Sequence, residues 1–95
     1  TSESTQTANP KMLIELAISR GVPLFNSGNT AACAAIYEVT CTALISMPDI
    51  SERSVSILRQ ALSEIQTTTD ESQKAWILRY ALDSTLRSLL MSERL

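Results

Sequence analysis

Apolar residues recur at spacings of three and four along most of the chain, which is the pattern of amphipathic helices. The first predicted helix begins at Pro10, with Asn9 as its N-cap. We expect Gly21 to end it as a left-handed cap and Pro23 to prevent its continuation. Residues 22–29 then form a connection. The only polar line of this helix comprises Lys11, Glu15 and Ser19.

The second predicted helix runs from about Thr30 to Met47, and Glu38 is its only charged residue. A helix that is apolar nearly all round lies at the centre of its fold or is covered by a partner. The apolar face is expected to comprise Cys33, Ile36, Tyr37, Thr40, Leu44 and Met47, extended by Val39 and Ala43. The water-facing line comprises Ala31, Ala35, Glu38, Thr42 and Ser46.

A strong helix start lies at residues 48–52, where Asp49 and Glu52 have the spacing of a capping box. The third helix follows to about Gln66 and ends at three consecutive threonines, because β-branched residues in series are poor helix formers. Its predicted core positions are Val55, Leu58, Leu62 and Ile65.

The fourth predicted helix has Asp70 as its cap and extends to about Met91. Its core stripe comprises Ala75, Leu78, Leu82, Leu86 and Leu89. Four helices with short connections predict an all-α fold, an antiparallel up-down four-helix bundle. We expect a single domain over residues 9–95, preceded by a disordered lead-in over residues 1–8, which is polar and lacks periodicity.

Composition narrows the range of possible functions. The 95 residues carry a net charge of −2 and no histidine. This balance argues against nucleic-acid binding, and the missing histidine excludes His-based triads and His metal sites. No apolar run is long enough to span a membrane. Catalytic motifs such as GxSxG, CxxC and HExxH are absent. We expect a soluble non-enzyme without cofactor or metal, either cytoplasmic or exported after removal of a signal peptide.

The two cysteines lie eight residues apart in one predicted helix. The helical rise separates Cys33 from Cys41 by about 12 Å, which is too far for a disulfide. We expect both to be buried, reduced thiols that act as small apolar residues.

Three groups of residues are candidate sites. Glu38 is either an isolated carboxylate with a raised pKa or a member of the water-facing line. Trp76, Arg79, Tyr80 and Asp83 lie three and four residues apart, so they form either a face that binds a planar or anionic ligand or a half-buried flank. Asn26 and Asn29 either present backbone N–H groups to an anion or form a turn and a helix cap.

The segment GVPLFNSGNTAACAAIYEVTCTALISMP, residues 21–48, resembles part of a tetratricopeptide unit. Gly28 and Asn29 resemble the pair that begins the family's second helix, and Tyr37 resembles the aromatic residue of that helix. Cys33 and Thr40 resemble its two small positions. Pro23 departs from the family, because it lies where the first helix of the unit continues. The resemblance implies binding of a peptide or protein.

Two segments, AISRGVPLFNSGNTAACAAIYE and WILRYALD, are similar to segments of a family of small bacterial all-helical proteins. That resemblance implies no particular activity.

These observations predict a non-catalytic helical module that binds a protein partner or itself. A homodimer is slightly favoured, because a first helix of about 11 residues leaves the second helix uncovered near Leu44, Ile45 and Met47. The alternative is a small-ligand-binding domain that uses a groove between the second and fourth helices, around Tyr37, Trp76 and Arg79.

Overall fold

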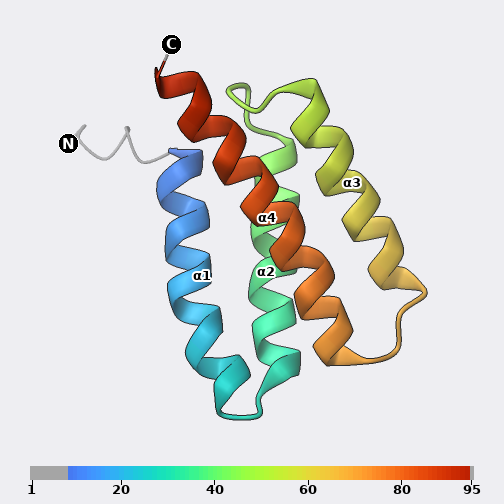
Figure 1. Cartoon of the computed structure of the whole chain (residues 1–95). Helices are drawn as coiled ribbons and strands as arrows, with labels where there is room; N and C mark the ends of the chain where they lie inside the picture. Colours follow the sequence, from blue (N-terminus) through green and yellow to red (C-terminus); the bar gives the residue numbers. More distant parts are fainter. Residues whose placement is uncertain (1–8, 95) are drawn as a thin grey trace, which may run out of the picture.

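A computed structural model describes residues 9–94 of the chain and shows an all-α fold (Figure 1). Its four helices are α1 (Pro10–Asn26), α2 (Thr30–Ile45), α3 (Glu52–Gln66) and α4 (Glu71–Arg94). Successive helices run in opposite directions, so the predicted up-down four-helix bundle is confirmed. No strand occurs between residues 9 and 94. The lead-in expected over residues 1–8 lies outside the described residues.

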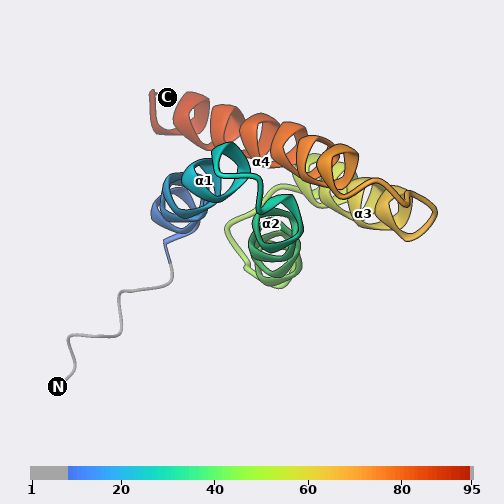
Figure 2. The same cartoon turned by 90° about the horizontal axis from the view of Figure 1, so that it is seen from below.

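Helices α2 and α4 form the central pair of the bundle, and α1 and α3 flank them. Each flanking helix packs against both central helices, whereas α1 and α3 do not touch within the described part of the chain. Figure 2 shows α4 extending across one side of the other three helices. The bundle is therefore flattened, and α4 has contacts along most of its length.

Apolar side chains from all four helices meet in one core. Ile14, Leu44, Leu58, Leu78 and Leu82 are fully buried there. The central place predicted for the second helix is confirmed, and all five residues of its predicted water-facing line are exposed. Val39 is a correction, because its side chain is 69% exposed and takes no part in the core.

Helix α1 is longer than the sequence predicted, and Gly21 and Pro23 lie inside it. A proline costs a helix one hydrogen bond and crowds the carbonyl four residues earlier. Leu24 and Phe25 pack against the core, and this burial offsets the cost of Pro23. Gly28, with φ +91°, has the left-handed conformation that was expected at Gly21.

The two helices of the first hairpin consequently have matched lengths, of 17 and 16 residues. Each spans about 25 Å, and the turns added to the end of α1 lie beside the beginning of α2 (Figure 1). Leu44 is fully buried, and Ile45 and Met47 are partly buried against the core. The uncovered patch that favoured a homodimer is therefore absent.

Side chains cap two of the helices as predicted. The Asn9 side chain accepts a hydrogen bond from the Met12 amide at 3.2 Å, and Asp70 Oδ1 accepts one from the Ser72 amide at 2.9 Å. Asn29 occupies the N-cap position of α2, but its side chain makes no capping hydrogen bond.

The cap of α3 differs from the prediction. Ser51, rather than Asp49, precedes the helix, and its hydroxyl accepts a hydrogen bond from the Ser54 amide at 3.2 Å. The first turn begins at Glu52, so Asp49 lies too early in the chain to reach it.

The buried faces of α3 and α4 differ in part from those predicted, because they include several small residues. Val55, Leu62, Leu86 and Leu89 are only partly buried. Ser54, Ala61, Ala81 and Thr85 are buried in addition to the predicted leucines. The Thr85 hydroxyl is satisfied because it donates to the Ala81 carbonyl at 2.9 Å.

Cys33 and Cys41 are both buried and both free thiols, as predicted. Burial, with a smaller contribution from the charge of Glu38, raises the pKa of Cys41 to about 12.

No helix within residues 9–94 is long and apolar enough to cross a membrane.

Candidate binding site

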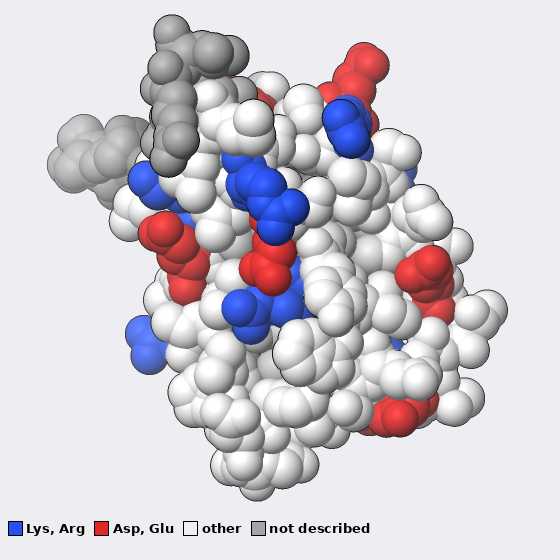
Figure 3. Space-filling model, viewed as in Figure 1, with Lys and Arg blue, Asp and Glu red and all other residues white. Residues whose placement is uncertain are grey.

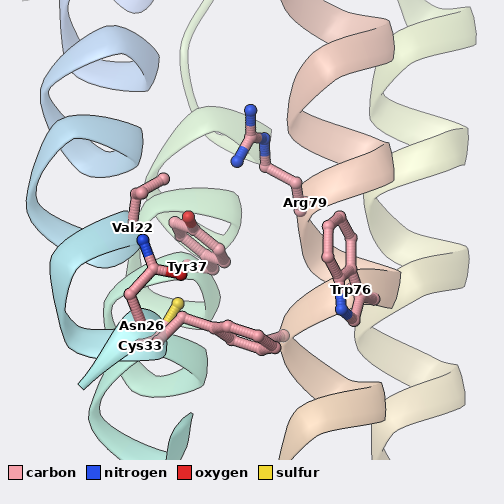
Figure 4. A pocket seen from close by; sticks show the side chains of 8 residues that line it. Val22, Asn26, Cys33, Tyr37, Trp76 and Arg79 are labelled. Carbon is pink, nitrogen blue, oxygen red and sulfur yellow. The ribbon is translucent and has the colours of Figure 1, made fainter. Parts of the chain in front are cut away.

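A pocket of about 180 Å³ opens where the C-terminal part of α1, the N-terminal half of α2 and the first half of α4 meet. Figure 4 shows Trp76 and Arg79 on the α4 side, opposite Val22, Asn26, Tyr37 and Cys33. The pocket is lined by Val22, Phe25, Asn26, Cys33, Tyr37, Ala75, Trp76 and Arg79.

Tyr37 forms the inner wall of this pocket and is buried. Its ring lies against the backbone of Gly21, in the space that a larger residue would fill. Burial raises the pKa of the Tyr37 hydroxyl, and Cys33 raises it further, whereas Arg79 acts in the opposite direction. The phenol therefore stays protonated at neutral pH and contributes a hydrogen-bonding group to the wall.

Arg79 is the only charged residue in the lining. Its Nε donates to Asp83 Oδ1 at 3.1 Å, one helical turn further along α4. Burial acts to lower the pKa of Arg79, but Asp83 and the Tyr37 hydroxyl outweigh it and raise the pKa. The guanidinium is thus charged and held in place, and its remaining N–H groups are available as donors.

Three aromatic rings from α1 and α4 form a continuous cluster beside the pocket. The centroids of Phe25 and Trp76 lie 5.7 Å apart with the rings at 72°, an edge-to-face contact. Trp76 and Tyr80 lie 5.8 Å apart at 35°. Trp76 is 47% exposed and Tyr80 is 66% exposed. We call Phe25, Trp76 and Tyr80 the aromatic surface.

The charges on this face of the molecule are sparse. Figure 3 shows basic and acidic side chains alternating in a short row over α4, within a largely uncharged surface. The spacing of Arg79, Asp83 and Arg87 on α4 corresponds to such a row. This face is therefore mainly uncharged, with one short charged row along α4.

The structure brings four of the candidate residues together, because Asn26, Tyr37, Trp76 and Arg79 all line the pocket. Two other candidate residues contact residues of the lining but do not line this pocket themselves. Asp83 holds Arg79, and Tyr80 stacks on Trp76 while lining a shallow groove between α3 and α4.

Asn29 and Glu38 do not join the site. Asn29 lies in the turn before α2, and Glu38 is an exposed member of the water-facing line.

The sequence analysis missed Val22 and Phe25, because Pro23 led us to place both in a connection. Val22, Phe25 and Asn26 have the spacing of one helical face, and this was the signal available. Cys33 and Ala75 were identified as core residues, which gave no reason to place them at a pocket.

The described residues contain no group of three or more side chains suited to hold a metal ion. Comparisons with protein-family models, with curated proteins and with solved structures found no match to this chain. The pocket offers a protonated phenol, an amide and a fixed guanidinium, which are groups that bind and orient a ligand.

Proposed function

We propose that the chain is a non-catalytic helical module that binds a protein partner through the aromatic surface and the adjacent pocket. The aromatic surface carries this proposal. Trp76 and Tyr80 expose large ring areas next to each other, and contiguous exposed apolar patches mark interaction sites. Tryptophan, tyrosine and arginine are also the residues that contribute most to binding at protein interfaces.

The size of the pocket suits one side chain of a partner. An apolar cavity of about 150 Å³ can hold a benzene ring. The pocket beside Trp76, at about 180 Å³, therefore has room for one phenylalanine or leucine side chain. If only a small ligand filled the pocket, the exposed rings of Trp76 and Tyr80 would remain in water. A protein partner would cover these rings as well.

The ion pair between Arg79 and Asp83 prepares the site for binding. The guanidinium is already held by Asp83, so binding costs little further side-chain entropy. A backbone carbonyl of the partner can accept one of the free N–H groups of Arg79. We infer binding rather than catalysis, because burial keeps Tyr37 protonated and unsuited to act as a base.

The tetratricopeptide resemblance is one of sequence and is carried by residues 21–48. That resemblance implies protein binding and thus supports the proposal. A second copy of the chain is one partner that the proposal allows, bound at the aromatic surface and not at Leu44, which is buried.

A small ligand in the same pocket is the second candidate function. It is favoured by the mixture of three rings with Arg79 and Asn26 in the lining. Pockets for drug-sized ligands begin at about 300 Å³, so the ligand would be a small one, close to a single ring.

Selection of a displayed peptide library on the whole chain tests the proposal. We expect the wild type to enrich peptides with a shared aromatic or leucine residue. Trp76→Ala and Tyr80→Ala should lose that enrichment. Val39→Ala is the matched control, because Val39 is at least as exposed as Trp76 and Tyr80 but lies outside the site. Equal enrichment on Trp76→Ala, with its helical content intact, would contradict the proposal.

A further inference from the structure

A second pocket, of about 440 Å³, lies between the beginning of α3 and the C-terminal half of α4. It shares no lining residue with the pocket beside Trp76. Two arginines, Arg53 and Arg87, line it together with the serines Ser54, Ser84 and Ser88. In Figure 3, basic side chains over α4 and over the start of α3 are separated by uncharged surface.

The charge of this pocket is unbalanced. No acidic residue is among those that line it. Arg79 and Lys74 are paired with carboxylates, but neither Arg53 nor Arg87 has an ion pair within the part of the chain that the structure describes. The lining thus carries two positive charges and no negative one, in a protein whose net charge is −2. This charge would attract an anion into the pocket.

A largely buried serine lines the same pocket. Ser54 is only 4% exposed, and its side chain lines the pocket. Its backbone amide is used by the Ser51 cap, but its hydroxyl makes no hydrogen bond within the described residues. The Ser54 hydroxyl oxygen is not cut off from the solvent in the pocket, so it is free to donate a hydrogen bond to a ligand there.

Two apolar residues also line the pocket. Ile57 of α3 and Met91 of α4 complete the lining. The volume exceeds what a phosphate group alone would fill, and these two side chains offer contact to a carbon skeleton.

We propose that this pocket binds a small organic phosphate. The phosphate lies between Arg53 and Arg87 and accepts a hydrogen bond from the Ser54 hydroxyl, and the organic part packs on Ile57 and Met91. Guanidinium forks match phosphate oxygens in pairs. A phosphate monoester has three terminal oxygens, enough for both arginines and a serine, whereas a carboxylate has two.

Titration of the whole chain with phenyl phosphate, followed by calorimetry and by NMR of the backbone amides, tests this proposal. We expect saturable binding with shifts at Ser54, Ser84 and Ser88. Arg53→Gln and Arg87→Gln should each weaken it by about tenfold, the loss expected for one charge-assisted pair. Arg59→Gln is the control, because Arg59 is an exposed arginine of α3 outside the pocket.

Ser54→Ala separates a specific site from diffuse attraction. It removes no charge, so weaker binding by Ser54→Ala supports a hydrogen bond to the phosphate. Inorganic phosphate should bind more weakly than phenyl phosphate, and phenol should not bind. Equal losses in Arg59→Gln, or equal binding of phenol, would overturn the proposal. Much tighter binding of a phosphoserine peptide would overturn the assignment to a small molecule.

Discussion

The ring of Tyr37 on α2 lies directly against the backbone of Gly21 on α1. A Cβ added at Gly21 would come within 2.6 Å of Tyr37 Cε1 and within 2.8 Å of its hydroxyl oxygen. Real Cβ atoms essentially never approach another atom so closely. The missing side chain at Gly21 therefore allows α1 and α2 to pack closely. This contact holds the Tyr37 ring at the inner wall of the pocket.

Gly21→Ala should lower the free energy of unfolding by about 1–2 kcal/mol, although alanine is the better helix former. The clash with the Tyr37 ring outweighs the gain in helix propensity of about 1 kcal/mol. Urea unfolding measures the change. The control is Ser19→Ala on the exposed side of α1, which should be neutral or stabilising. A more stable Gly21→Ala protein would contradict the packing described for Tyr37.

Pro23→Ala should raise the free energy of unfolding by about 1–3 kcal/mol. The new amide at position 23 can donate to the Ser19 carbonyl, and the crowding by the proline ring disappears. Pro23 is exposed, so no core contact is lost. Thermal unfolding followed by circular dichroism measures the effect, and a lower midpoint would show that α1 does not continue through this residue.

Much of the fold follows from patterns that the sequence displays. The spacing of Leu78 and Leu82, the Asp70 cap and the water-facing line of α2 depend on local periodicity, and each was predicted. The end of α1 was not, because Gly21 and Pro23 are local signals of a helix end. The burial of Leu24 and Phe25 overrides those signals, and it depends on α4, which is distant in the sequence.

Part of the candidate site was also predictable from the spacing of residues within one helix. Trp76, Arg79 and Asp83 share a face of one helix, so their spacing brought them together. The contact of Trp76 with Phe25 depends on how α1 and α4 pack, which spacing within either helix does not encode. The three serines and two arginines of the second pocket likewise come from two helices, and no local pattern links them.

Alkaline pH should destabilise the wild type through Cys41. Burial raises the pKa of this thiol from 9.0 to about 12 in the folded protein. Below pH 9 the Cys41 thiol is protonated in both the folded and the unfolded protein, so its contribution to stability is fully present. Above pH 9 the unfolded protein loses this proton first, which favours unfolding. Stability is therefore lost as the pH rises from 9 toward 12. Between pH 8 and about 10.5 we expect a loss on the order of 1–2 kcal/mol from this group.

Cys41→Ala is the comparison for this pH dependence. Its stability at pH 8 will be lower because a core side chain is shortened, but its decline toward alkaline pH should be shallower than that of the wild type. Parallel declines in urea unfolding experiments would show that Cys41 contributes nothing to it.

The two thiols should differ in their access to small reagents. Both are buried, but Cys33 lines the pocket beside Trp76, whereas Cys41 is fully enclosed. In native protein both should react far more slowly than a free peptide, with Cys33 the faster. Mass spectrometry after timed alkylation, with Cys33→Ala and Cys41→Ala to assign the products, gives the two rates. Faster labelling of Cys41 would contradict the location of the pocket.

The fluorescence of Trp76 tests the central claim most directly, since it is the chain's single tryptophan and half of its surface is exposed. Peptides selected on the wild type should be titrated against the whole chain while its emission is recorded. We predict a saturable shift to shorter wavelength, at the affinity that calorimetry gives, and the same shift in Val39→Ala. Saturable binding that leaves the Trp76 emission unchanged would contradict a partner site at the aromatic surface.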